Sequence, residues 1–151
     1  MNQYRVLFVC LGNICRSPVA DGLMRHRAAD AGLAVEVESA GTGDWHIGDP
    51  PQHGSQMVAV KNGFDIANLR ARKVEAEDFF DFTHIVAMDS ANFADVERLQ
   101  PEGSTAELLL LNKGEEDENV LDPYGMDDDA FETMFDQIDG GIARLLARLR
   151  R

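Results

Sequence analysis

Three consecutive segments near the start of the chain constrain its fold most. Residues 5–10, RVLFVC, form a short apolar run of strand-forming residues, typical of a strand buried on both faces. Residues 18–32 place apolar side chains at helical spacing and end on Gly32, and residues 35–39, VEVES, alternate as a half-exposed strand does. A strand, a helix and a strand within residues 5–39 predict a βαβ unit and therefore a parallel sheet.

The rest of the chain repeats this pattern. Residues 84–89 and 107–112 read as two more buried strands, and helices are expected at 54–62 and 91–99. A final helix carries one apolar stripe: Phe131, Met134, Phe135, Ile138, Ile142, Leu145, Leu146 and Leu149. The sequence predicts a single α/β domain spanning residues 1–151, with a four-stranded parallel sheet flanked by helices on both faces.

Charge and cysteine content exclude several classes of function. A net charge of −13 argues against nucleic acid or an anionic membrane as the main partner. The apolar residues before Cys10 are too few for a signal peptide, and no later segment approaches a transmembrane span, so a cytoplasmic protein is expected. Two cysteines then suggest catalysis or redox chemistry. The acidic runs at 115–118 and 127–129 are interpreted as solvated surface.

The segment VCLGNICRSP, residues 9–18, lies between the first strand and the first helix. Cys10 is expected to end the strand, with Ser17 as the helix cap and Pro18 at the first helical position. The loop between them then lies at the carboxyl edge of the sheet, where its backbone N–H groups can converge on an anion. Gly12 and Asn13 are residue types that tolerate the left-handed backbone of such a tight loop.

Two side chains give this predicted phosphate-binding loop a chemical function. Arg16 offers a planar fork for two phosphate oxygens, and the same positive surroundings favour a thiolate at Cys10, aimed at phosphorus. A metal site is disfavoured because the four histidines form no ligand-like cluster with the cysteines. A nucleotide-binding P-loop is disfavoured because the Gly-Lys-Ser/Thr ending is missing. An inert buried thiol at a strand end remains the simpler alternative.

The string CLGNICRSP, from Cys10 to Pro18, resembles the signature of the low-molecular-weight protein tyrosine phosphatase family. The resemblance implies hydrolysis of phosphotyrosine monoesters in proteins, and of small aryl phosphates, through a phosphocysteine on Cys10, without metal or cofactor. It also implies that Asp122, in the sequence DPYG, is the general acid and base. Asp-Pro is a turn signal as well, and a turn there would fix the carboxylate.

The same resemblance assigns the substrate pocket. It implies that the loop residues Leu11, Gly12, Asn13, Ile14, Cys15 and Ser17 contribute, and that Leu11, Ile14, Trp45 and Tyr124 form apolar walls. Cys15 is implied to be a redox partner that traps oxidised Cys10 as a disulfide, although a small buried hydrophobe is the simpler reading. Relatives that dephosphorylate arginine carry threonine where this chain has Ile14. Leu69 stands where many relatives have a histidine, so a hydrogen bond that braces the loop is missing or replaced.

Other functions remain open on the same scaffold. An arsenate reductase would need more cysteines than Cys10 and Cys15, a phosphoarginine phosphatase is less favoured by Ile14, and a non-catalytic phosphopeptide-binding module would not need Asp122. The expected partners are a phosphotyrosine-containing protein and inorganic phosphate or sulfate at the loop, with no nucleic acid and no membrane. The chain is expected to be a monomer or weak dimer.

Overall fold

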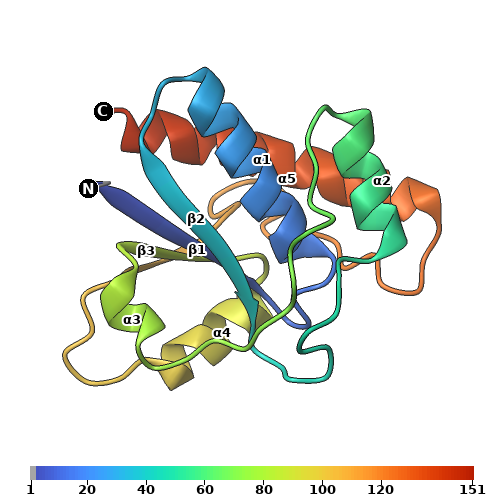
Figure 1. The fold of residues 1–151 in the computed structure, drawn as a ribbon. Coiled ribbons are helices and arrows are strands. Elements are labelled where there is room, and N and C mark those ends of the chain that lie inside the picture. Colours follow the sequence, from blue (N-terminus) through green and yellow to red (C-terminus); the bar gives the residue numbers. More distant parts are fainter. Residues whose placement is uncertain (1–2) are drawn as a thin grey trace.

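A computed structural model describes residues 3–151 and contains one parallel sheet of four strands in the order β2-β1-β3-β4 (Figure 1). The strands are β1 Tyr4–Cys10, β2 Val35–Gly41, β3 His84–Ala87 and β4 Glu107–Leu110. The helices are α1 Arg16–Asp30, α2 His53–Lys61, α3 Asp78–Asp81, α4 Ser90–Leu99 and α5 Asp128–Leu149. The predicted α/β class with four parallel strands is confirmed.

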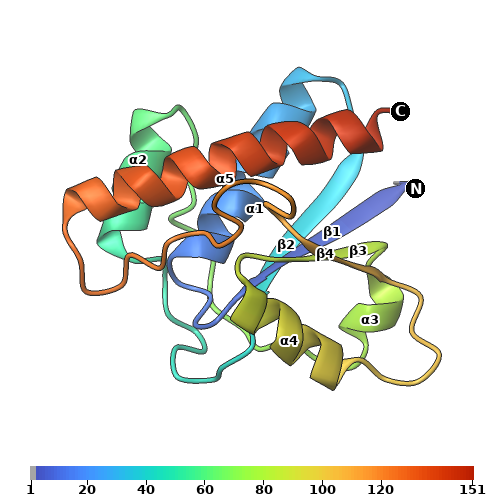
Figure 2. The ribbon, with the colours of Figure 1, turned by 180° about the vertical axis from the view of Figure 1, so that it is seen from behind.

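The inner strand β1 is covered by helices on both of its faces. Val6 and Phe8 belong to the larger apolar cluster, with α1, α2 and α5, whereas Leu7 and Val9 belong to the smaller cluster, with α3 and α4. Figures 1 and 2 show these two groups of helices on opposite faces of the sheet. The run RVLFVC is therefore apolar at consecutive positions because both faces of the strand are covered.

The start of α1 differs from the prediction. The helix begins at Arg16 with Cys15 at the N-cap, so Pro18 is its third residue and Ser17 is not the cap. The Ser17 hydroxyl is engaged elsewhere, 3.0 Å from the Cys10 sulfur and 2.7 Å from the Asn13 amide nitrogen. Helix α3, four residues long, lies in a segment for which the sequence analysis predicted no helix or strand. Among the residues described, no helix combines the length and the apolar composition needed to cross a bilayer.

The loops that follow the strands meet at the carboxyl edge of the sheet. The loop after β2 is tied to the loop after β1, because the Thr42 N–H donates to the Cys10 carbonyl and the Gly43 N–H donates to the Leu11 carbonyl, each at 2.9 Å. The Met88 N–H after β3 donates to the Val9 carbonyl at 3.1 Å. This edge is where open α/β sheets bind ligands.

Candidate active site

The Cys10 sulfur lies at the base of the loop that joins β1 to α1. Cys10 is 2% exposed, and its sulfur accepts a hydrogen bond from the Asn13 N–H at 3.3 Å and lies 3.0 Å from the Ser17 hydroxyl. Asn13 has a φ of 60°, in the left-handed region. Both contacts stabilise negative charge on the sulfur, since each donor can point its hydrogen at a thiolate.

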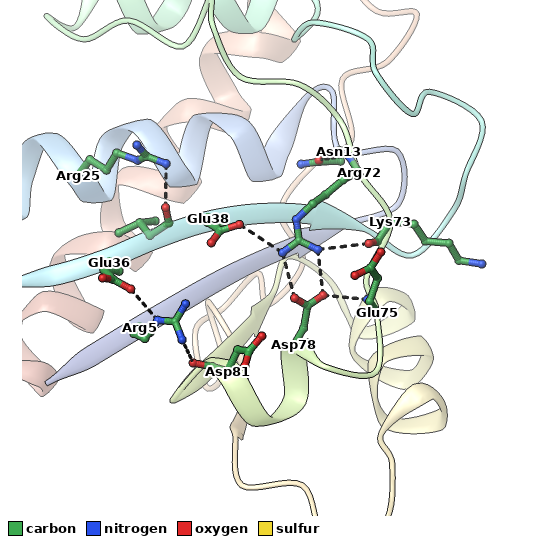
Figure 3. A network of polar contacts seen from close by, with 11 residues as sticks. Arg5, Asn13, Arg25, Glu36, Glu38, Arg72, Lys73, Glu75, Asp78 and Asp81 are labelled. Atoms are coloured by element: carbon green, nitrogen blue, oxygen red, sulfur yellow. Dashed lines mark hydrogen bonds and ion pairs between the residues drawn. The ribbon is translucent and has the colours of Figure 1, made fainter. Parts of the chain in front are cut away.

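Asn13 is held at both ends of its side chain. Its amide nitrogen donates to the Ser17 hydroxyl at 2.7 Å, and its amide oxygen accepts from the Arg72 backbone N–H at 3.0 Å. Arg72 is fixed in turn, because its guanidinium binds the Asp78 carboxylate at 2.9 and 3.1 Å (Figure 3). Leu69 packs against the larger apolar cluster. The hydrogen bond that braces the loop therefore comes from the Arg72 backbone and not from residue 69.

Arg16 is anchored on one side and free on the other. Its Nη1 donates to Asp89 Oδ2 at 2.6 Å and to the Val120 carbonyl at 3.2 Å, whereas Nη2 lies 3.6 Å from Asp122 Oδ2. Burial disfavours the charge, but Cys10, Asp89 and Asp122 together raise the pKa of Arg16 above its usual value. Within residues 3–151 the buried Nε has no hydrogen-bond partner. Nε and Nη2 thus remain available to a bidentate anion beside the sulfur.

Asp89 is the residue at this site that the sequence analysis missed. It follows β3 and caps α4, because its Oδ1 accepts from the Asn92 N–H at 2.7 Å while Oδ2 binds Arg16. An aspartate between a buried strand and a helix lies at the ligand-binding edge of the sheet. Its place in the sequence could therefore have predicted that Asp89 belongs to the site.

The pocket above the sulfur has a volume of about 90 Å³ and brings together three separate segments of the chain. Its lining is Cys10, Leu11, Gly12, Ile14, Cys15, Arg16, Trp45, Asp122 and Tyr124. Trp45 and Tyr124 are 69% and 56% exposed, so they lie at the mouth of the pocket. Of the predicted site residues, Asn13 and Ser17 do not line the pocket and instead lie beneath it.

The loop that carries Asp122 is a turn, as its Asp-Pro sequence indicates. The Tyr124 N–H donates to Asp122 Oδ1 at 3.2 Å, which leaves Oδ2 toward Arg16. The Tyr124 ring also packs near the His46 ring, with 5.9 Å between centroids. This contact joins the loop after β2 to the loop before α5 across the mouth of the pocket.

Cys15 has a different environment from Cys10. It is buried, and burial together with the nearby Cys10 and Asp122 raises its pKa to about 12. Cys15 is therefore a neutral thiol at physiological pH. Both cysteines are free. Within residues 3–151, no group of three or more His, Cys, Asp or Glu side chains is arranged to hold a metal ion.

Comparison with known proteins identifies the family. Residues 5–151 match the low molecular weight phosphotyrosine protein phosphatase family. The chain belongs to this family. It is 38% identical to the low molecular weight protein-tyrosine-phosphatase YfkJ of Bacillus subtilis, covering 97% of this chain and 96% of that protein. It is 40% identical to a low molecular weight phosphotyrosine protein phosphatase of Schizosaccharomyces pombe, covering 89% of each.

Solved structures agree with this assignment. The crystal structure of YfkJ superimposes with a TM-score of 0.90 at 37% identity, over 99% of this chain and 96% of that one. The Drosophila arginine phosphatase superimposes with a TM-score of 0.92 at 33% identity, over 97% of this chain and 98% of that one. The fold is therefore shared by relatives that are named for different phosphorylated residues.

Proposed function

We propose that this chain hydrolyses phosphotyrosine monoesters in proteins, as well as small aryl phosphates, through a phosphocysteine on Cys10. The observation that carries the proposal is the shared pocket, in which the Cys10 sulfur, the free side of Arg16 and the Asp122 carboxylate all face one small volume. These are a nucleophile, an oxyanion clamp and a proton donor, the set that phosphate ester cleavage requires.

The reaction has two steps. The Cys10 thiolate attacks phosphorus, the bond from phosphorus to the tyrosine oxygen breaks, and Asp122 donates a proton to that oxygen. Water then attacks the phosphocysteine, Asp122 accepts its proton, the phosphorus–sulfur bond breaks, and phosphate leaves. Arg16 Nε and Nη2, with the backbone N–H groups of the loop, hold the phosphoryl oxygens in both transition states.

The shape of the pocket supports an aryl substrate. The sulfur is buried, whereas Trp45 and Tyr124 extend into solvent, so the phosphate must enter on a long, flat side chain. Phosphoserine is too short to reach the sulfur past these walls. Phosphoarginine is the second candidate, because a relative of the same fold is named an arginine phosphatase. Ile14, buried in the lining, supports phosphotyrosine, since it offers an apolar contact to a ring.

Two further properties belong to the proposal. When a peroxide oxidises Cys10 to a sulfenic acid, the Cys15 thiol condenses with it to form a disulfide and release water. Thiol reductants then reduce this disulfide and restore both cysteines. A cytoplasmic location fits two free cysteines and a catalytic thiolate. The oligomeric state expected from the sequence, a monomer or weak dimer, is part of the proposal.

Two substitutions and three substrates test the proposal. Cys10→Ser is expected to abolish turnover of nitrophenyl phosphate while inorganic phosphate, or sulfate, still binds at the loop. Asp122→Ala is expected to slow phenyl phosphate more than nitrophenyl phosphate, because nitrophenolate leaves without a proton. Peptides bearing phosphotyrosine are expected to react faster than those bearing phosphoserine or phosphoarginine. Near-normal turnover by the Cys10→Ser variant would contradict the mechanism, and preference for phosphoarginine would contradict the substrate.

A further inference from the structure

Every charge exposed on the two loops that flank the pocket mouth is negative. The segments 40–52 and 121–129 contain no lysine or arginine. They carry six exposed aspartates, which we call the acidic rim: Asp44, Asp49, Asp122, Asp127, Asp128 and Asp129. The one cation in the pocket lining, Arg16, has a side chain that is 3% exposed and already faces Asp89. A substrate that approaches the mouth therefore meets a negative surface before it meets Arg16.

The acidic rim is attached to the walls of the pocket on both sides. Asp44 directly precedes the wall residue Trp45, and the Asp49 carboxylate lies 3.2 Å from the His46 ring, which packs near Tyr124. On the other side, Asp127 follows the Tyr124 turn and caps α5, placing Asp128 and Asp129 in the first turn of that helix. These carboxylates thus surround the position of the residues next to a bound phosphotyrosine.

A second hollow adjoins the phosphate-binding loop. Its volume is about 410 Å³ and it lies between α2 and the start of α5, which cross in Figures 1 and 2. The beginning of α2 is bonded to the loop, because the Gln52 N–H donates to the Ile14 carbonyl at 2.8 Å. Since His53 and Gly54 line the hollow and Ile14 lines the pocket, this bond connects the walls of the two hollows.

The lining of the hollow combines apolar and acidic groups. Met57 and Phe131 offer apolar surface, and Asp128 and Glu132 supply carboxylates. Lys61, the one lysine in the lining, is bound to Glu132 at 2.8 Å. Asp128 takes part in no ion pair within residues 3–151. The hollow thus presents one unpaired carboxylate next to an apolar surface, an arrangement suited to a long aliphatic side chain that ends in a cation.

We propose that the preferred substrates carry lysine or arginine close to the phosphotyrosine, and that one such side chain occupies this hollow beside Asp128. Its methylene groups lie on Met57 and Phe131, and its cation faces the Asp128 carboxylate. This inference rests on the proposed function, since it concerns the same pocket. The phosphate dianion alone is repelled by the acidic rim, and a neighbouring cation on the peptide offsets that repulsion during encounter and binding.

The expected size follows from exposed charge pairs. One solvent-exposed ion pair shifts an equilibrium by up to about fivefold, so two pairs give a preference on the order of tenfold. Ions in solution screen such pairs over about 10 Å at 0.1 M salt and about 3 Å at 1 M, so the preference must shrink with salt. The preference is expected in kcat/KM, because it acts on capture of the substrate.

The test uses two phosphotyrosine peptides of equal length, one with arginine and one with glutamate on both sides of the phosphotyrosine. At low salt, wild-type protein is expected to show a kcat/KM about tenfold higher for the arginine peptide, falling toward equality near 1 M salt. A variant with Asp44→Asn, Asp128→Asn and Asp129→Asn is expected to lose at least about threefold of this ratio. The ratio is measured within each variant, so altered stability or chemistry cancels.

A matched variant separates the acidic rim from the charge of the whole molecule. Glu77→Gln, Glu97→Gln and Glu102→Gln remove three exposed carboxylates near α3 and the end of α4, at the amino edge of the sheet. This variant is expected to keep the wild-type ratio. If it loses as much as the rim variant, or if the wild-type protein turns over both peptides equally, the inference is wrong. If neither peptide reacts, the proposed function itself fails.

Discussion

Replacement of Asp89 by asparagine keeps the helix cap and removes the anionic acceptor that holds Arg16. Asparagine keeps the shape of the side chain and is as good a helix cap as aspartate, so the bond from the Asn92 N–H to the capping oxygen survives. With the amide oxygen kept as the cap, the amide nitrogen takes the place of Asp89 Oδ2, which lies 2.6 Å from Arg16 Nη1, and an NH2 group cannot accept from a guanidinium. The variant therefore removes both the negative charge and the acceptor that face a guanidinium whose side chain is 3% exposed.

The magnitude follows from that difference. A hydrogen bond between charged groups contributes about 1.5–3 kcal/mol, and none replaces it in the variant, so Asp89→Asn is expected to lower the free energy of unfolding by about 1.5–3 kcal/mol. For a chain of this length that is a decrease in Tm of roughly 3–12 °C. Inorganic phosphate supplies a replacement counter-charge to Arg16, so saturating phosphate is expected to reduce the deficit relative to wild type.

The assay is urea denaturation with and without phosphate, with Asp89→Ala as the comparison. The alanine variant loses the cap as well, at a further cost of about 1 kcal/mol, and phosphate is expected to leave that part of the deficit unchanged. A deficit for Asp89→Asn below about 0.5 kcal/mol, or one that grows when phosphate is added, would refute the view of Asp89 as the counter-charge of Arg16.

Two more outcomes follow from buried positions elsewhere in the fold. Burial raises the pKa of Asp21 from 3.8 to about 6, despite its bond to Arg25, so the charged carboxylate destabilises the folded state above pH 6 and this penalty disappears as the pH falls toward 4. The free energy of unfolding of the wild-type protein is measured by urea titration beside that of Asp21→Asn at pH 7 and at pH 4. Relative to the variant, the wild-type value is expected to rise by up to about 3 kcal/mol from pH 7 to pH 4, and a constant difference would contradict the raised pKa. A Cβ on Gly41 would lie 2.7 Å from the Leu11 carbonyl oxygen, so Gly41→Ala is expected to displace the phosphate-binding loop, to cost about 1–3 kcal/mol and to reduce aryl phosphatase activity. Gly140→Ala in α5 is the control, expected to gain up to about 1 kcal/mol with unchanged activity, and equal activity of the two variants would contradict the steric argument.

The parts of the structure that the sequence predicted are those encoded locally. The run RVLFVC is apolar at each buried position of β1, and the stripe from Phe131 to Leu149 is buried along α5, because each pattern is set by the faces that one element covers. Leu11 to Cys15 form a loop because they stand directly between a strand and a helix. Trp45 and Tyr124 were placed at the pocket by resemblance to the family, since neither segment has a local pattern that points there.

The parts that were missed depend on contacts distant in sequence. The ion pair that anchors Arg16 joins residues 73 positions apart, and the order β2-β1-β3-β4 is set by how the layers pack together. The brace on Asn13 comes from the backbone of Arg72, which no side-chain pattern reveals. The start of α1 was misjudged because Ser17, a good cap in isolation, is drawn to the Cys10 sulfur by tertiary structure.

The first turn of α1 has no side-chain cap, since Cys15, its N-cap residue, forms no side-chain hydrogen bond to the turn. A serine or aspartate at position 15 would cap the helix and stabilise the protein without substrate. Its oxygen, however, would accept from the backbone N–H groups that a phosphoryl group needs. We therefore expect stability and turnover to be opposed at this one position, with the reacting anion acting as the N-cap of the helix during catalysis.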